Sequence, residues 1–284
     1  MANEWWRHLR GRPFYWAVDG THPAADLFVL RHVMGRPKRS RGLNAARLAL
    51  QVSPEVEALI TRLEQKSASL WARYDSPLWT LSMLAELGVR GDDERIAEAL
   101  DWALDQQIEV DGAPINANAI LLHIALAFGF SDDERVQTRL TRLQDEICTL
   151  SGASTEQAEW LTVAAMALAE QPEAERDVAT VASLSHHLKT LEPANLTHYQ
   201  RHGFPIFDQP DDLVLAQAAL RLNIAGKWLQ PWIERIENAQ DERGLWHLDR
   251  ALPTPASIAW EAEGEPSRWI SAKAMYVLRA FYGE

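Results

Sequence analysis

Two adjacent carboxylates stand at the start of an apolar stretch and are the residues in this sequence best suited to acid catalysis. Asp211 and Asp212 follow Pro210 and precede the run Leu213 to Leu222. Burial in apolar surroundings raises the pKa of a carboxyl group, which a general acid needs. Asp directly after Pro is also typical of a helix N-terminus, where its side chain caps backbone N–H groups. Both interpretations of the pair remain open, an acid facing a cavity and a helix cap.

A polar cluster directly precedes these aspartates. It contains His198, Tyr199 and His202, in a segment rich in Pro and His. The cluster could orient Asp211 or clamp the anionic head group of a ligand, or it could be a solvated loop. No His or Cys pair has metal-ligand spacing, and no phosphate-binding loop or serine-hydrolase elbow appears. We therefore expect no metal and no cofactor.

Aromatic residues begin several of the apolar segments. The chain has 12 Trp, and Trp79, Trp160 and Trp269 each stand near the start of such a segment, while Tyr74 lies just before one. Ring faces turned to a cavity would stabilise cationic centres or stack on sugars. The alternative is that each ring fills the core.

Another charged group surrounds Trp269. Glu261 and Arg268 flank it, and they could form an ion pair across the mouth of a cavity. An ordinary salt bridge within a loop is the alternative, and it would contribute little if exposed.

The elements that would position these residues are helices of two alternating kinds. One kind is apolar nearly all round, which indicates a helix buried on every side. The other kind has a single apolar face. The expected inner helices are 24–34, 76–88, 116–129, 157–169, 211–223 and 268–282. The expected outer helices include 54–65, 173–190 and 227–240, and two more with apolar faces at Ile96 to Gln107 and Val136 to Ile147.

A repeat of about forty residues accompanies this alternation. The string Asp-Asp-Glu-Arg occurs at 92–95 and again at 132–135, each time where an outer helix would start. We predict an all-α protein, an α/α toroid of about six inner and six outer helices. An open solenoid is the alternative, but it would leave both of its ends uncapped.

The sequence favours one domain over 1–284, with residues 1–22 as an N-terminal cover. Two Pro-rich insertions, 192–210 and 247–266, interrupt the repeat, and each precedes an inner helix. Both should therefore lie at the same mouth of the barrel, where long loops are often functional.

Composition excludes several classes of function. The net charge is −12, which argues against nucleic acid and against anionic membrane surfaces. The single Cys148 suits a reducing compartment, and no signal peptide or transmembrane run is apparent. We expect a cytoplasmic protein.

The segment 240–246 reads Gln-Asp-Glu-Arg-Gly-Leu-Trp and resembles the Gln-x-x-x-Gly-x-Trp motif of squalene–hopene cyclases and related prenyltransferase-repeat proteins. Degraded copies stand at 65–71 and 107–112. In this motif Gln would cap backbone groups, Gly would make the turn and Trp would pack between hairpins. The whole chain also looks like a little-characterised group of bacterial single-toroid proteins, through 22–26 with Leu30-Arg31, 203–207 leading to Asp211, and 265–269.

This resemblance implies roles for particular residues. Class II terpene cyclases protonate an alkene with the middle Asp of an Asp-x-Asp-Asp motif, and Gln209-Pro210-Asp211-Asp212 aligns with that motif. The analogous acid is Asp211, although Gln209 replaces the first Asp. Protein prenyltransferase β-subunits share the single toroid and bind zinc, but their Asp-x-Cys pattern is absent here.

Three hypotheses follow. The first is a terpene cyclase-like protein that binds an apolar, isoprenoid-type molecule, with Asp211 as the acid. The second is a non-catalytic toroid that binds a partner protein or a ligand. The third is a carbohydrate-active α/α barrel, with two carboxylates drawn from Asp75, Asp211, Asp212 and Glu261.

Overall fold

The computed structural model describes residues 4–64, 76–106, 116–206, 209–251 and 261–283. Within these ranges the chain forms thirteen α-helices, several short 3₁₀ or π turns and a single pair of two-residue strands. The prediction of an all-α protein is confirmed. None of the helices in the described ranges combines the length and the apolarity needed to cross a bilayer.

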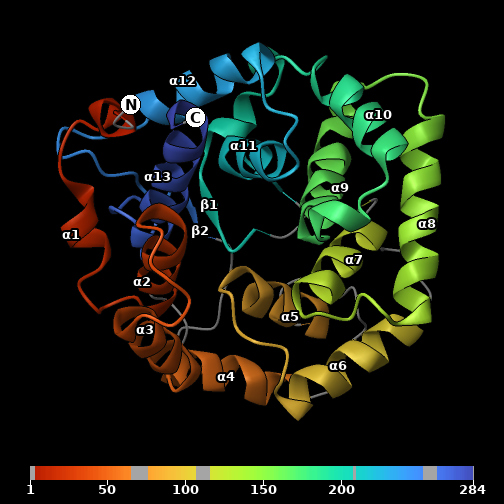
Figure 1. Cartoon of the computed structure of the whole chain (residues 1–284), viewed down its shortest axis with the longest axis horizontal. Coiled ribbons are helices and arrows are strands. Elements are labelled where there is room, and N and C mark those ends of the chain that lie inside the picture. The colour runs from red at the N-terminus through yellow and green to blue at the C-terminus, as the bar shows by residue number, and fades with distance from the viewer. Residues whose placement is uncertain (1–3, 65–75, 107–115, 207–208, 252–260, 284) are drawn as a thin grey trace.

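Six helices surround the centre of the molecule (Figure 1). Neighbours pack against one another in the order α5, α7, α9, α11, α13 and α2, and a π-helical turn, η2 (Val29–Val33), continues α2. The helices α3 and α4 complete the circuit between α2 and α5. The bounds of the inner helices are α2 (Pro23–Phe28), α5 (Pro77–Glu86), α7 (Ala117–Ala127), α9 (Ala158–Glu170), α11 (Asp212–Arg221) and α13 (Arg268–Tyr282).

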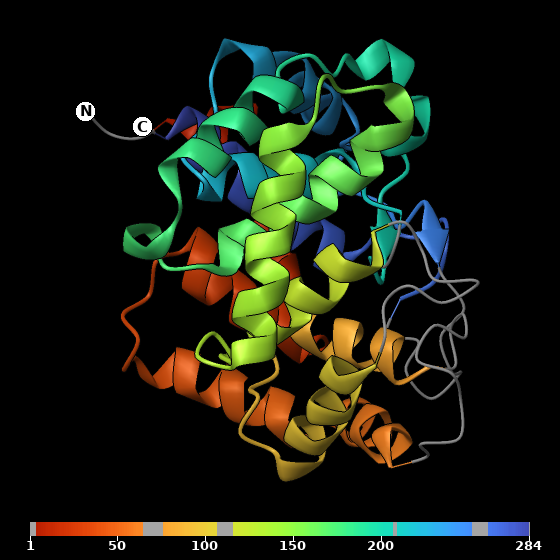
Figure 2. The same ribbon diagram turned by 90° about the vertical axis from the view of Figure 1, so that its right-hand side faces the viewer.

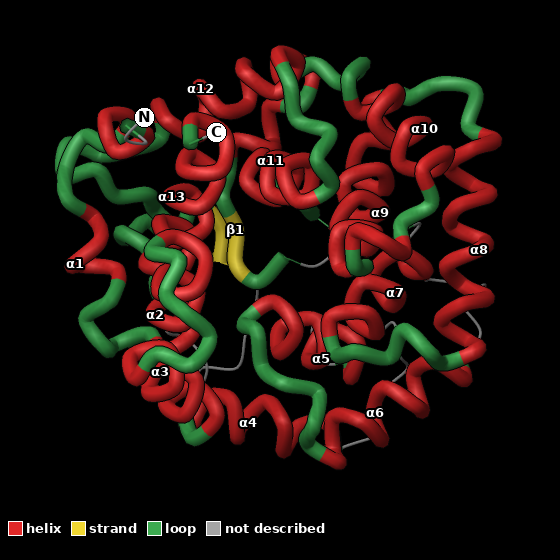
Figure 3. Tube along the Cα trace, viewed as in Figure 1, coloured by secondary structure: helices red, strands yellow, loops and turns green. Residues whose placement is uncertain are grey.

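A second layer of helices lies outside these six (Figure 3). Its members are α1 (Pro13–Ala17), α3 (Arg41–Gln51), α4 (Pro54–Leu63), α6 (Glu94–Asp105), α8 (Glu134–Thr149), α10 (Val178–Leu188) and α12 (Gln230–Asn238). The longest of the seven, α8, runs along the outside of the molecule (Figure 2).

The helix α3 is absent from the sequence-based expectation. Its buried face consists of only Leu43, Ala46 and Leu50, and the apolar Leu48 lies outside that face, exposed to solvent. The buried face is therefore narrow and easily overlooked in the sequence. Ser40 nevertheless starts it, because the side-chain oxygen of Ser40 accepts the backbone N–H of Leu43.

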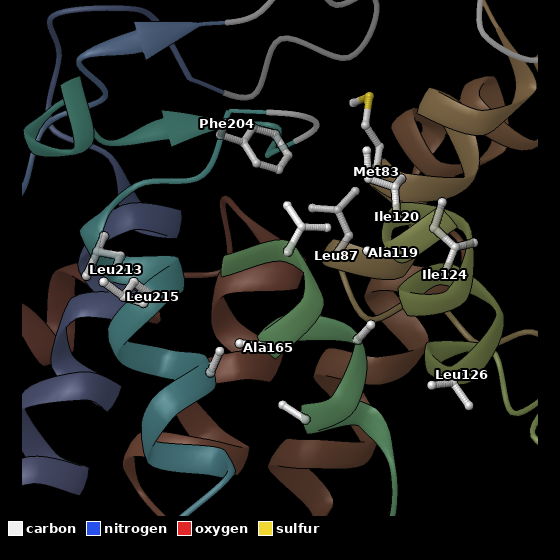
Figure 4. Close-up of a cluster of buried hydrophobic side chains, with 14 of the residues drawn as sticks. Met83, Leu87, Ala119, Ile120, Ile124, Leu126, Ala165, Phe204, Leu213 and Leu215 are labelled. Carbon is white, nitrogen blue, oxygen red and sulfur yellow. The ribbon is translucent and has the colours of Figure 1, made fainter. Parts of the chain in front are cut away.

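The two layers differ in composition as burial requires. Nine of the eleven residues of α7 are buried, whereas α8 buries only Val136, Leu140, Leu143 and Ile147 of its sixteen. The core is continuous between adjacent inner helices: Figure 4 shows Leu213 and Leu215 of α11 near Ala165 of α9. Tight packing of such apolar faces, at roughly 25 cal/mol per Å² removed from water, holds the layers together.

Two insertions meet beside the start of α11. Strands β1 (Gly203–Phe204) and β2 (Arg250–Ala251) pair in parallel, and the carbonyl of His202 accepts the N–H groups of Asp249 and Arg250. The described parts of segments 192–210 and 247–266 are therefore in direct contact.

The segment 240–246 links the chain's last outer helix to its N-terminal residues. Gln240 accepts the N–H of Arg10 and donates to the carbonyl of His8, and Gly244 adopts a φ of 80°. Trp246 is fully buried and its Nε1 donates to the carbonyl of Ile236. The two degraded copies of this motif, 65–71 and 107–112, lie outside the described residues.

Candidate functional site

Asp211, the analogue of the terpene-cyclase acid, caps α11. It is fully buried, its Oδ1 accepts the N–H of Val214 and its Oδ2 accepts the N–H of Gly203, both at 3.0 Å. Each carboxylate oxygen is therefore occupied by a backbone donor.

Asp212 lies in a buried ion-pair cluster on the other side of α11. Its Oδ1 is 2.8 Å from Nε2 of His202, and its Oδ2 is 3.4 Å from Nε of Arg235. Burial raises the pKa of Asp212, against the opposing charge of His202. Burial by itself would lower the pKa of His202. The charge and hydrogen bond of Asp212 oppose burial, and the net result is a raised pKa for His202. Through His202 and Arg235, Asp212 connects segment 192–210 and α12 to α11.

Glu261 and Arg268 are not paired through their side chains. Glu261 accepts the N–H groups of Arg268 and Trp269 and the hydroxyl of Ser267, so it caps the start of α13. The Arg268 side chain binds Asp19 at 2.6 Å and covers the ring of Trp16. Burial raises the pKa of Glu261, against these hydrogen bonds.

The remaining members of the polar cluster point in different directions. Tyr199 is buried, and its hydroxyl is 3.1 Å from Oγ1 of Thr162. His198 is about half exposed and forms an ion pair with Glu159 at 3.2 Å. Of the cluster, His202 alone contacts Asp212. Tyr74 and Asp75 lie outside the described residues.

The three tryptophans also divide. Trp79 is buried in the core, and Trp160 is half-buried against it. Trp269 is fully buried, and it is the one of the three that lines the central cavity.

That central cavity has a volume of about 250 Å³ and is enclosed by all six inner helices. Its apolar and aromatic lining includes Phe28, Met166, Ala169, Val214, Ala218, Trp269 and Tyr276. Its titratable or charged lining residues are Arg31, His32, Glu86, His123, Glu170, Arg221 and Lys273. It therefore combines an apolar wall with buried charges.

One group of these charges centres on Glu86, at the end of α5. Its Oε1 accepts Nζ of Lys273 at 2.9 Å and Nε1 of Trp269 at 3.0 Å, and its Oε2 accepts the N–H of Ile206 at 2.8 Å. Lys273 is buried, and its Nζ lies 5.5 Å from the ring centroid of Trp269. Glu86 and Lys273 neutralise each other in the cavity wall, and breaking such a pair leaves one charge uncompensated.

A second group centres on Glu170, at the end of α9. Arg221 binds it through both Nη atoms, at 2.6 and 2.8 Å. Burial would raise the pKa of Glu170, but the hydrogen bonds from Arg221 and the charges of its neighbours outweigh burial and lower it. His123 lies close by, with its Nδ1 3.8 Å from Oε1 of Glu170, and burial lowers the pKa of His123.

An aromatic wall faces these charges. The ring of Phe28 packs edge-on against Trp269 and Tyr276, with centroids 5.5 and 5.9 Å apart. His32 packs against the same Tyr276. Burial lowers the pKa of His32 to about 4, so this imidazole is neutral near pH 7.

Sequence reasoning missed most of the charged cavity residues, although a signal for them exists. His123 lies inside the mostly apolar α7, Glu86 ends the mostly apolar α5, and Lys273 stands among the buried residues of α13. A titratable side chain in such a position needs a buried partner. The carboxylates that were singled out stand instead at helix starts, and the structure uses Asp211 and Glu261 as caps. No group of three His, Cys, Asp or Glu suited to a metal occurs in the described ranges.

Comparisons with known proteins add little to this geometry. No family model matches the chain, and no curated protein matches it. A solved structure of a type II terpene cyclase from Scytonema, in complex with geranylgeranyl dihydroxybenzoate, is similar over 82% of this chain and 97% of that one. The identity is 16% and the TM-score 0.29, values too low to carry an argument about this chain.

Proposed function

We propose that the chain is a closed α/α toroid of the terpene-cyclase and prenyltransferase kind, and that its central cavity binds one small molecule with a largely apolar body. The observation that carries this proposal is the cavity itself, which every inner helix lines and which presents an aromatic wall of Phe28, Trp269 and Tyr276. Its volume lies just below the roughly 300–1,000 Å³ of typical ligand pockets, which suits a small ligand.

The charged residues of the cavity favour ligand binding without acid catalysis. Acid-initiated cyclisation needs a neutral carboxyl group facing an apolar well. Glu86 and Glu170 face the cavity, but each is ion-paired, and Asp211 does not line it. The same pairing weighs against a glycoside hydrolase, which needs one protonated and one free carboxyl group.

A substitution that fills part of the cavity with a large side chain tests this proposal. Ala218 of α11 lines the cavity, so an Ala218→Phe variant should place a ring within it. We expect calorimetry to detect binding of neutral amphiphiles of six to ten carbons to the wild-type protein and to lose it in the variant. Native mass spectrometry of the protein as purified should show the same difference in any co-purifying molecule.

Ala179→Phe is the matched control, because Ala179 is exposed on the outer helix α10. Equal binding by Ala218→Phe and Ala179→Phe would place the ligand elsewhere. An absence of binding by the wild-type protein across the whole panel would refute a ligand-binding cavity and leave the partner-protein hypothesis.

A further inference from the structure

The charges that line the cavity do not cancel. Five lining residues carry a formal charge, and four of them form the pairs Glu86 with Lys273 and Glu170 with Arg221. The fifth, Arg31, makes no ion pair or side-chain hydrogen bond with any described residue. The lining therefore has one positive charge left over.

Arg31 stands at the opening of the cavity. It is exposed to solvent, and it lines both the central cavity and an adjoining hollow that includes Arg90, Phe128 and Glu170. It belongs to η2, the π-helical turn in which the N–H of Met34 reaches back to the carbonyl of Val29. Single π turns of this kind are frequent at functional sites.

A second polar atom of the cavity lining is close to a charge but has no hydrogen bond among the described residues: Nδ1 of His123 lies 3.8 Å from Oε1 of Glu170. A pure hydrocarbon ligand at the opening would cover the guanidinium of Arg31 without a hydrogen-bond acceptor, which is unfavourable. It would also leave the buried Nδ1 of His123 without a hydrogen bond. A ligand with polar atoms would avoid that cost.

We propose that the cavity's ligand is an amphipathic monocarboxylate, whose carboxylate binds Arg31 at the opening and whose hydrocarbon body lies along Phe28, Trp269 and Tyr276. This inference rests on the proposed ligand-binding function and names its ligand class. A guanidinium binds a carboxylate through two parallel hydrogen bonds. One unpaired cation matches one negative charge, whereas a phosphate would leave part of its charge unbalanced.

The experiment compares three ligands with the same body and different head groups: octanoate, octanamide and octylamine. Calorimetry on the full chain should give octanoate an affinity at least about tenfold above that of octanamide, in line with a charge-assisted hydrogen bond. Octylamine should bind more weakly than octanamide. In Arg31→Gln the affinity for octanoate should fall to that for octanamide, while the affinity for octanamide stays within about twofold.

Arg36→Gln is the matched control, because Arg36 is an exposed arginine five residues away that does not line the cavity. It should keep the preference for octanoate. Circular dichroism melting of both variants checks that each is folded.

The possible outcomes distinguish the carboxylate assignment from the proposed ligand-binding function. If all three ligands bind equally, or octylamine binds best, the carboxylate assignment is wrong and the ligand-binding cavity stands. The assignment is equally wrong if Arg31→Gln retains the preference. If none of the three binds, both proposals fail.

Discussion

Asp211 matches part of a catalytic sequence motif, and its side chain caps a helix. Its two oxygens hold the first turn of α11 and the N–H of Gly203 from the preceding insertion. A side chain with both acceptors engaged fixes where β1 lies relative to α11. At the scale of a single residue, its contribution to stability can be measured separately from any contribution to ligand binding.

Asp211→Ala should lower the free energy of unfolding by about 2–3 kcal/mol, because it leaves two buried N–H groups unsatisfied. Urea unfolding measures this loss. Asp177→Ala is the control: Asp177 caps α10 at an exposed position, so we expect a loss of about 1 kcal/mol. A large loss of ligand affinity in Asp211→Ala with unchanged stability would instead favour the acid role.

His32 gives the stability of the protein a dependence on pH. Its pKa falls from 6.5 to about 4 on folding, first because of burial and then because of nearby Arg31. The unfolded chain therefore binds a proton before the folded one as the pH decreases. This contribution to stability is fully present above pH 6.5 and is lost as the pH falls towards 4.

His32→Phe keeps an aromatic ring against Tyr276 and removes the titration. Between pH 7 and pH 4 the free energy of unfolding of the wild-type protein should fall relative to the variant by at most about 3 kcal/mol. Chemical unfolding across this range measures the difference. Parallel pH profiles for the two proteins would show that His32 does not titrate differently on folding.

At the scale of elements, the two Asp-Asp-Glu-Arg strings join successive outer helices. Asp93 and Asp133 cap α6 and α8. Arg95 reaches back to Glu57 of α4, and Arg135 reaches back to Asp101 and Asp105 of α6. Each string therefore starts one outer helix and ties it to the one before. The pairs are largely exposed, so their role is more in orientation than in stability.

The turn at Gly244 makes a testable contact between elements. Gly244 has a φ of 80°, and a Cβ there would lie 2.7 Å from the backbone N of Gly11. Gly129 has a similar φ of 85°, but a Cβ there would meet nothing within 4 Å. Gly129→Ala should cost about 1–2 kcal/mol from backbone strain alone.

Gly244→Ala should cost more, because the added methyl must also displace the N-terminal segment. Thermal unfolding of the two variants measures the difference. Equal destabilisation would mean that the contact between Gly11 and Gly244 contributes nothing.

At the scale of the whole molecule, the two ends of the chain lie close together (Figure 1). The 3₁₀ turn η1 (Trp5–His8) packs on α13, and His8 is 3.1 Å from Glu237 of α12 and stacks on Tyr282. The N-terminal residues thus cover the last helices of the circuit. This contact is the one that the proposed closed toroid requires, because an open solenoid would leave its ends exposed.

Substitution of Trp5 and of its neighbour Trp6 tests whether packing of the N-terminal residues stabilises the protein. Trp5 is 9% exposed and packs edge-on against Phe14, whereas Trp6 is 55% exposed. Trp5→Ala should lower the free energy of unfolding by about 3 kcal/mol, and Trp6→Ala should change it by less than about 0.5 kcal/mol. Denaturant unfolding distinguishes them, and equal effects would show that packing of the N-terminal residues does not stabilise the protein.

The sequence by itself determined the class of each helix, because burial on one side or on all sides leaves a local pattern of apolar residues. That pattern predicted α7 as an inner helix and α8 as an outer one. It also marked Asp211 as a helix start, which the structure bears out through the N–H of Val214. The pattern did not predict α3, because this helix buries only three residues and its apolar face is narrow.

Only the tertiary structure decided which charges meet. Glu86 and Lys273 are 187 residues apart, and Glu170 and Arg221 are 51 apart, so neither pair leaves a local signature. Each pair forms because helix packing brings two inner helices to the same cavity wall, where an unpaired charge would be too costly. Among the described residues, the same packing gives Arg31 no ion-pair partner at the opening. The periodicity of apolar residues indicates whether a residue is buried, and the packing of the helices determines which residues it is buried against.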